Sequence, residues 1–224
     1  MTGQQEPVIW MRPQQAAVGR PAERSRAEIT AAAVALADED GLEAVSMRRV
    51  ATSLGTGAAT LYRYVSTRDD LLDLMIDSTA REYDLPTPSG DWQADLLTVA
   101  RQAQQIMRRH PWLPALVITR PTLGPAGIDL LEHVLDVLAD HPAAAAAKLE
   151  AFALLMALTA LFTQNELAGT GPDSGRAAAY LHHVAAAGSH PRLAALLGTA
   201  VPPRDDRRDQ FGAVLERVLT GLLG

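Results

Sequence analysis

Apolar residues recur every three or four positions along most of the chain, which is the spacing of one face of an α-helix. No segment keeps the alternation of apolar and polar residues that a half-buried β-strand requires. The first sustained helical pattern begins after Ser25 and ends in acidic residues followed by Gly41, which suits the left-handed position just past a helix. The pattern therefore predicts an all-α protein.

Two short helices joined by a glycine-containing turn are predicted between residues 46 and 65. The hydroxyl of Ser46 can cap the first helix, and Gly55 ends it. The second helix has one apolar face for a small three-helix core. Its other face is expected to point outward and carries Thr60, Arg63 and Tyr64.

The charges around this motif differ from those of the whole chain. The 224 residues carry a net charge of -6, which argues against a generic nucleic-acid coat. Between residues 20 and 68, however, every cation is an arginine, and arginine binds phosphates or guanine edges with two hydrogen bonds. An exposed helix flanked by arginines indicates a DNA-binding helix-turn-helix. The alternative is that Tyr62 and Tyr64 belong to the core and that the arginines form a solvated surface.

Two prolines and Gly90 interrupt the helical pattern between residues 85 and 90, so a domain boundary is expected there. Residues 1–22 show no sustained period and predict a flexible arm, in which Val8, Ile9 and Trp10 can dock locally. The chain is therefore divided into an arm at 1–22, a first helical domain at 23–84 and a larger helical domain at 91–224.

Several classes of function are disfavoured by composition. The chain has no cysteine, which excludes disulfides, thiolate metal sites and a catalytic cysteine. No H-E-x-x-H or G-x-S-x-G motif is present, and neither catalysis nor a resident metal or cofactor is expected. The apolar run at 151–162 is shorter than a bilayer span, and the first residues do not resemble a secretory signal. We therefore expect a cytoplasmic protein without membrane association.

Four short motifs of the first domain form a recognisable set, at residues 46–51, 54–55, 60–65 and 68–72. With the rest of residues 24–77, they resemble the DNA-binding domain of the tetracycline-repressor (TetR) family of transcriptional regulators. The remaining chain resembles the C-terminal half of that family through Thr119-Arg120-Pro121 and a long alanine-rich helix. The resemblance implies an N-terminal three-helix bundle with a helix-turn-helix, followed by a larger α-helical domain for ligand binding and dimerisation.

The resemblance also implies a function. Such a protein binds a palindromic double-stranded DNA operator as a homodimer and is released by a small-molecule inducer. The implied DNA-binding residues are Arg48, Ala58, Ala59, Thr60, Tyr62, Arg63, Tyr64 and Arg68. Many relatives have a polar residue where this chain has Ala58 and Ala59, so contact with thymine methyl groups is the expected substitute.

The implied ligand pocket has candidate residues in the second domain, although a packing role is the alternative for each of them. They are Met107, Trp112, Arg120, His133, Met156, Phe162 and Gln164, with Trp92 and Asn165 as further candidates. His110 is expected instead to meet the last carbonyl groups of a helix. In the tetracycline repressor a histidine near the Thr-Arg-Pro run binds metal, but Leu116 takes that place here, so a metal-chelated ligand is not expected.

An apolar stripe on the last helix is the candidate dimer interface, and a purely intramolecular core helix is the alternative. The stripe consists of Phe211, Val214, Leu215, Val218 and Leu222. Two other functions remain open from the sequence: a constitutive DNA-binding regulator without ligand, and a helical adaptor that binds another protein.

Overall fold

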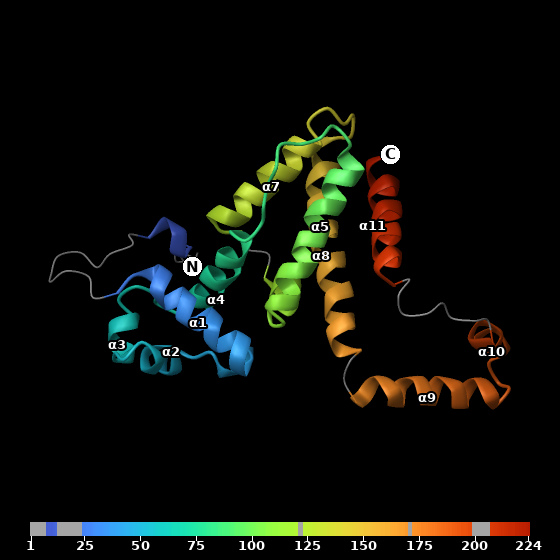
Figure 1. The fold of residues 1–224 in the computed structure, drawn as a ribbon, viewed down its shortest axis with the longest axis horizontal. Helices are drawn as coiled ribbons and strands as arrows, with labels where there is room; N and C mark the ends of the chain where they lie inside the picture. The colour runs from blue at the N-terminus through green and yellow to red at the C-terminus, as the bar shows by residue number, and fades with distance from the viewer. Residues whose placement is uncertain (1–7, 13–23, 121–122, 170–171, 199–206) are drawn as a thin grey trace, which may run out of the picture.

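A computed structural model describes residues 8–12, 24–120, 123–169, 172–198 and 207–224. In these residues the regular structure consists of eleven α-helices and two short 3₁₀ helices, η1 and η2, without a strand (Figure 1). The predicted all-α fold, with a helix-turn-helix bundle followed by a larger helical domain, is confirmed.

The N-terminal head is a small bundle in which α1 and α4 pack together and α2 and α3 lie against them. Its elements are η1 (Ile9–Met11), α1 (Arg26–Asp40), η2 (Leu42–Ala44), α2 (Met47–Ser53), α3 (Ala58–Leu61) and α4 (Arg68–Ala80). Local sequence fixes the helix starts. Ser25 and Glu28 form a reciprocal capping box at α1, and Thr67 and Asp70 form one at α4. Of the three residues predicted to dock locally, Ile9 is buried and Trp10 half-buried, whereas Val8 is exposed. Apart from residues 8–12, the predicted arm lies outside the described residues.

The larger domain is built around the long helix α8 (Ala145–Ala168), which packs against three other helices of the domain. These are α5 (Trp92–Arg109), α6 (Leu113–Thr119) and α11 (Arg207–Leu223). A fourth helix of the domain, α7 (Pro125–Val137), also contacts α8 and reaches α4 and α5. The apolar core of the head continues into this domain, because Ile106, Met107 and Ala160 belong to the same buried cluster as the head residues.

Among the described residues, α8 is the one helix with the length and hydropathy of a membrane span. The apolar run at 151–162 lies within this helix, and its two flanks differ in exposure. Phe152 and Leu155 are buried, whereas Leu154 and Leu161 are exposed on the opposite flank. One side of α8 thus packs in the domain core, and the other side exposes apolar side chains on the surface of the chain.

Helices α9 (Pro172–Ala186) and α10 (Pro191–Gly198) pack on each other and stand apart from the body of the molecule in Figure 1. Their exposed side chains include Tyr180 and Leu196. The helical spacing of apolar residues does not identify α10, because this helix is short and none of its residues is buried.

Candidate functional site

The turn between α2 and α3 depends on local chemistry. The Ser46 hydroxyl accepts a hydrogen bond from the backbone N–H of Arg49, which caps α2 as predicted. Gly55 follows α2 with a φ of 64°, a conformation that side chains with a Cβ rarely adopt. The chain then closes through a hydrogen bond from the Thr56 N–H to the Ala51 carbonyl, 2.9 Å long. This turn directs α3 outward from the head.

The outer face of this motif carries exposed side chains that are free to meet a partner. Arg48, Ala59 and Arg63 are exposed, and Tyr62 is 51% exposed. Thr60 and Ala58 are half-buried. Within the described part of the chain, the guanidinium groups of Arg48 and Arg63 form no ion pair. Six of the eight predicted DNA-binding residues therefore lie at or beside one surface.

The prediction that Tyr64 points outward is wrong. Regular helix ends at Leu61, and the turn that follows carries Tyr64 into the head core, where it is only 6% exposed. Its carbonyl accepts a hydrogen bond from Nε of Arg26 at 3.0 Å. The alternative of a core aromatic, weighed for both tyrosines, holds for Tyr64 and not for Tyr62.

Other arginines of the head also have structural roles. The Arg68 guanidinium, predicted to hold a phosphate, donates to the carbonyls of Val45 and Leu42 at 3.2 and 3.3 Å. Arg24 donates to the Leu54 carbonyl at 2.6 Å. These contacts tie the helix-turn-helix to the helices beside it. The exposed arginines of the motif are Arg48, Arg49 and Arg63, and of these Arg49 is paired with Asp40.

A cavity of about 410 Å³ lies where the head meets the larger domain, lined by α4, α5, α6, α7 and α8. Its walls are mainly apolar and include Ile76, Leu113 and Val117. Three predicted ligand residues lie in this wall, namely Met107, Arg120 and Met156. Helix α4 is shared, because Thr79 and Ala80 line the cavity while the same helix forms the core of the head.

The other predicted ligand residues lie outside this wall. Trp112 is buried and donates its indole N–H to Asp38, and Phe162 packs edge-on against Phe211 with ring centroids 5.3 Å apart. His133 is half-buried on α7, and Gln164 and Asn165 are exposed on α8. Periodicity alone could not separate these core and surface positions from the cavity, because the cavity forms between five helices.

Arg120 reaches the cavity wall but its charge is already paired with the head. Its guanidinium donates to Asp73 at 2.8 and 3.1 Å and to Asp69 at 2.9 Å. Partial burial alone would lower the pKa of Arg120, but the hydrogen bonds and charges of Asp73 and Asp69 outweigh burial and raise the pKa. The predicted polar ligand group is therefore also a bridge from the end of α6 to α4.

Two more aspartates of α4 are held by groups outside the helix. Asp70 forms a two-pronged ion pair with Arg12, with distances of 2.8 and 3.0 Å. Asp77 accepts the Gly127 N–H in the first turn of α7 at 3.1 Å. A Cβ at Gly124 would lie 2.3 Å from Asp77 Oδ1, so this approach requires glycine. Sequence analysis missed these contacts, although the acidic residues of α4 recur at helical spacing.

A further set of contacts between the head and the larger domain lies at the corner between α5 and α6. His110, 8% exposed, places Nδ1 2.7 Å from Oδ1 of Asp38 and Nε2 2.8 Å from Oε1 of Glu82. The ring therefore meets carboxylates from α1 and from the segment after α4, and not the helix carbonyls that the sequence predicted. Burial would raise the pKa of Glu82, but hydrogen bonds from Arg109 and His110 outweigh it and lower the pKa.

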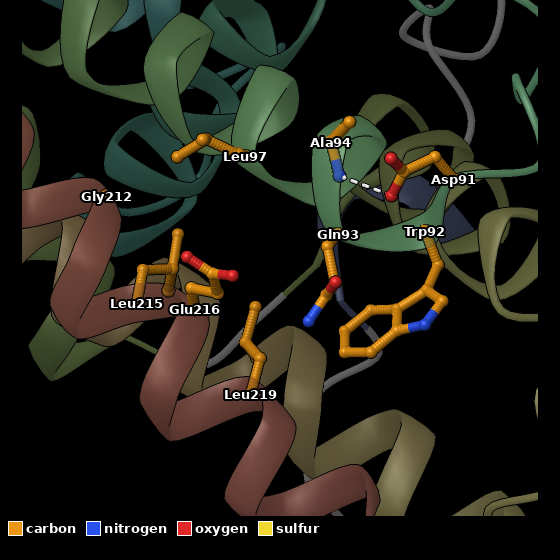
Figure 2. A pocket seen from close by; sticks show the side chains of 9 residues that line it. All are labelled: Asp91, Trp92, Gln93, Ala94, Leu97, Gly212, Leu215, Glu216 and Leu219. Carbon is orange, nitrogen blue, oxygen red and sulfur yellow. Dashed lines mark hydrogen bonds between the residues drawn. The ribbon is translucent and has the colours of Figure 1, made fainter.

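A smaller hollow of about 230 Å³ lies at the other end of α5, against α11, as Figure 2 shows. Asp91 caps α5 by accepting the Ala94 N–H at 3.1 Å, the dashed line of Figure 2. Trp92 lines this hollow and packs edge-on against His141, with ring centroids 5.1 Å apart. Trp92, a further candidate for the ligand pocket, thus belongs to a different region from the main cavity.

The stripe predicted as a dimer interface is divided between two roles. Phe211 and Leu215 are buried inside the chain with the core of α5 and α8, so the intramolecular alternative is right for these two residues. Val214, Val218 and Leu222 are half-buried at the edge of that core. Among the described residues, no group of three or more His, Cys, Asp or Glu side chains is placed to hold a metal ion.

Comparison with known proteins adds independent evidence on the identity of this architecture. Residues 29–75 match the family model described as bacterial regulatory proteins of the tetR family, and residues 85–224 match the tetracyclin repressor-like C-terminal domain. The chain belongs to the TetR family. In this TetR family member the first match lies within the head, and the second covers the larger domain.

The relatives of this TetR family member include a named repressor and a structurally defined regulator. The HTH-type transcriptional repressor DrrR1 of Streptomyces coeruleorubidus is 37% identical over 206 residues, which cover 87% of this chain and 75% of DrrR1. ActR of Streptomyces coelicolor in complex with (S)-DNPA is 31% identical with a TM-score of 0.78, covering 91% of this chain and 98% of ActR. ActR in complex with actinorhodin also gives a TM-score of 0.78 at 31% identity, over 91% and 97%. The chain is thus a DNA-binding transcriptional regulator of the TetR type.

Proposed function

We propose that this regulator is a homodimeric repressor that binds a palindromic DNA operator and is released when a small molecule enters the cavity. The observation that carries the proposal is the position of α4, which forms the core of the head and also a wall of the cavity. A ligand that displaces α4 would change the separation of the two recognition helices in the dimer and weaken operator binding. The proposal includes a cytoplasmic location.

The DNA-contacting surface in this proposal is narrower than the one inferred from sequence. Helix α3 enters the major groove, with Ala59 and the half-buried Thr60 near base edges and Tyr62 and Arg63 at phosphates. Arg48 reaches the backbone or a base edge from α2. Tyr64 supports this surface from the core, and the exposed Arg68 supports it from the side through its bonds to backbone carbonyls.

The proposed dimer uses the flank of α8 that the single chain leaves exposed. Leu154 and Leu161 lie on this flank, and Val214, Val218 and Leu222 of α11 supply the half-buried edge. Two copies would bury these side chains in a four-helix interface. The two recognition helices of such a dimer read half-sites separated by about 34–36 Å or a multiple of it.

The chemistry of the cavity suggests what kind of inducer it accepts. The walls are mainly apolar, and the charge of Arg120 is already balanced by Asp69 and Asp73, which favours an uncharged ligand. Burial raises the pKa of the Tyr83 hydroxyl, so at this wall it stays protonated and can donate to a ligand oxygen. ActR, which shares this fold, has been crystallised with (S)-DNPA and with actinorhodin, which supports a small-molecule ligand here.

The proposal is tested first by selecting the preferred operator from a pool of random duplexes. Arg63→Ala and Tyr62→Ala should each weaken binding to the selected duplex about tenfold or more. Arg63→Ala should also reduce the slope of log affinity against log salt concentration by about one. Arg101→Ala and Tyr180→Ala serve as matched controls, since both side chains are exposed on helices outside the head, α5 and α9. Loss of binding in the controls, or none in the head variants, would contradict the docking.

The inducer half of the proposal has its own test. Compounds that raise the melting temperature of the protein are added to the complex with the selected duplex, and release is measured by fluorescence anisotropy. Val117→Trp, which fills the cavity, should abolish the response to the compound and leave operator binding intact. A compound that binds this variant as well as the original protein would place the ligand elsewhere.

A further inference from the structure

His110 makes a pair of contacts that only one protonation state of its ring satisfies. Each ring nitrogen lies within 2.8 Å of a carboxylate oxygen. Nδ1 of His110 faces Asp38, and Nε2 of His110 faces Glu82. A neutral imidazole has one N–H and one lone pair, so it can donate to only one of these oxygens. The doubly protonated ring donates to both. The Asp38 oxygen also accepts the Trp112 indole N–H at 2.7 Å, which confirms its role as an acceptor.

The charges around the ring balance when His110 is positive. Asp38 approaches from the end of α1, Glu82 from the segment after α4, and Arg109 of α5 donates to Glu82. Two carboxylates therefore face two cations. The neighbouring Arg108 is paired with Glu166 of α8 and completes the set of charged groups on this turn. The network joins both long helices of the head to the corner between α5 and α6.

We propose that His110 is a proton-dependent joint between the DNA-binding head and the ligand-binding domain. The charged ring holds α1 and α4 in the arrangement that binds the operator. Loss of one ring proton places a lone pair against a carboxylate oxygen less than 3 Å away, which is repulsive and loosens the head. Operator affinity therefore falls as the pH rises and the ring loses its second proton.

The ring protons are observed directly in the free protein by nuclear magnetic resonance, with ¹⁵N-labelled histidine and the full chain. At pH 6 both nitrogens of His110 should show the chemical shifts of N–H groups. As the pH rises, backbone amides near Asp38 and Glu82 should shift with the same midpoint as the ring. A ring nitrogen without a proton at pH 6 would overturn the proposal, since a carboxylate would then hold the shared proton.

Operator binding provides the second readout and rests on the proposed function. Between pH 6 and pH 8, the affinity for the selected duplex should fall about fivefold or more, at the low end of ordinary coupling between sites. His110→Gln should bind weakly with no such pH dependence. His190→Gln is the matched control, because His190 is an exposed histidine before α10, and it should behave as the original protein.

Asp38→Asn separates the charge of the joint from its packing. The amide can donate to a neutral His110 and still accept the Trp112 N–H, so this variant should keep its affinity at pH 8 and lose the pH dependence. If His110→Gln does not fold, this variant decides. If operator affinity depended on pH as strongly in Asp38→Asn or in folded His110→Gln as in the original protein, the proposal would be overturned. Failure to select any operator would sink the proposed function alone, since the ring titration needs no DNA.

Discussion

The head has two sides that are built in opposite ways. On the DNA-facing side, Arg48 and Arg63 are exposed and form no ion pair within the described residues. On the other side, formed by α4, Asp70 and Asp77 are buried and bound by groups from distant parts of the chain. One side is left free for a partner, whereas the other fixes the angle at which the head is held. Substitutions should therefore affect binding on the first side and folding on the second.

The largest effect is expected at Asp70, whose side chain is only 8% exposed and faces Arg12 at 2.8 Å. Asp70→Ala removes this buried two-pronged pair and half of the α4 capping box. We expect a loss of about 3 kcal/mol in the free energy of unfolding, measured by urea denaturation at fixed protein concentration.

The neighbouring residue gives the matched control for this prediction. Asp69 is 74% exposed and pairs with Arg120 at the surface, so Asp69→Ala should cost less than about 1 kcal/mol. Equal losses in the two variants would show that burial does not distinguish the two sides of α4.

A smaller effect is expected where the DNA-facing side depends on a backbone conformation. Gly55→Ala places a Cβ at a φ of 64° with no neighbour within 4 Å, so the cost is conformational strain of about 1–2 kcal/mol and not a clash. Gly57→Ala, at a φ of -84°, should leave the stability nearly unchanged. Thermal unfolding of both variants checks this, and a larger loss at Gly57 would contradict the assigned turn.

The features that the sequence revealed are those that depend on near neighbours. The cap at Ser46 and the turn at Gly55 each involve residues within a few positions, so a local pattern identifies them. Tyr64 was misplaced because the helical period was extended past the point where regular helix ends. Beyond the last residue of a regular helix, the 3.6-residue period no longer says which side a side chain faces.

The contacts that hold α1 and α4 from other parts of the chain could not be predicted in the same way. Arg12 and Asp70 are 58 positions apart, and His110 and Asp38 are 72 positions apart, so no local pattern relates them. Arg120 illustrates the limit well. The sequence placed it correctly at the cavity, but its pairing with Asp73 depends on how α6 crosses α4, which only the folded chain defines.

The smallest predicted effect concerns the free energy of unfolding at acid pH, and it depends on Glu82 in the segment after α4. Burial opposes ionisation of Glu82, but hydrogen bonds from Arg109 and His110 hold its pKa below the ordinary value. A lowered folded-state pKa contributes stability that is present above the ordinary carboxylate pKa and is lost as the pH falls through the lowered one. Glu82→Gln should therefore lose less stability than the original protein between pH 6 and pH 3.5. Because Glu82 is about a third exposed, solvent screening keeps the difference small. Urea denaturation across this pH range measures it. If the two proteins lost stability in parallel, the bonds from Arg109 and His110 to Glu82 would contribute nothing to holding the head in place.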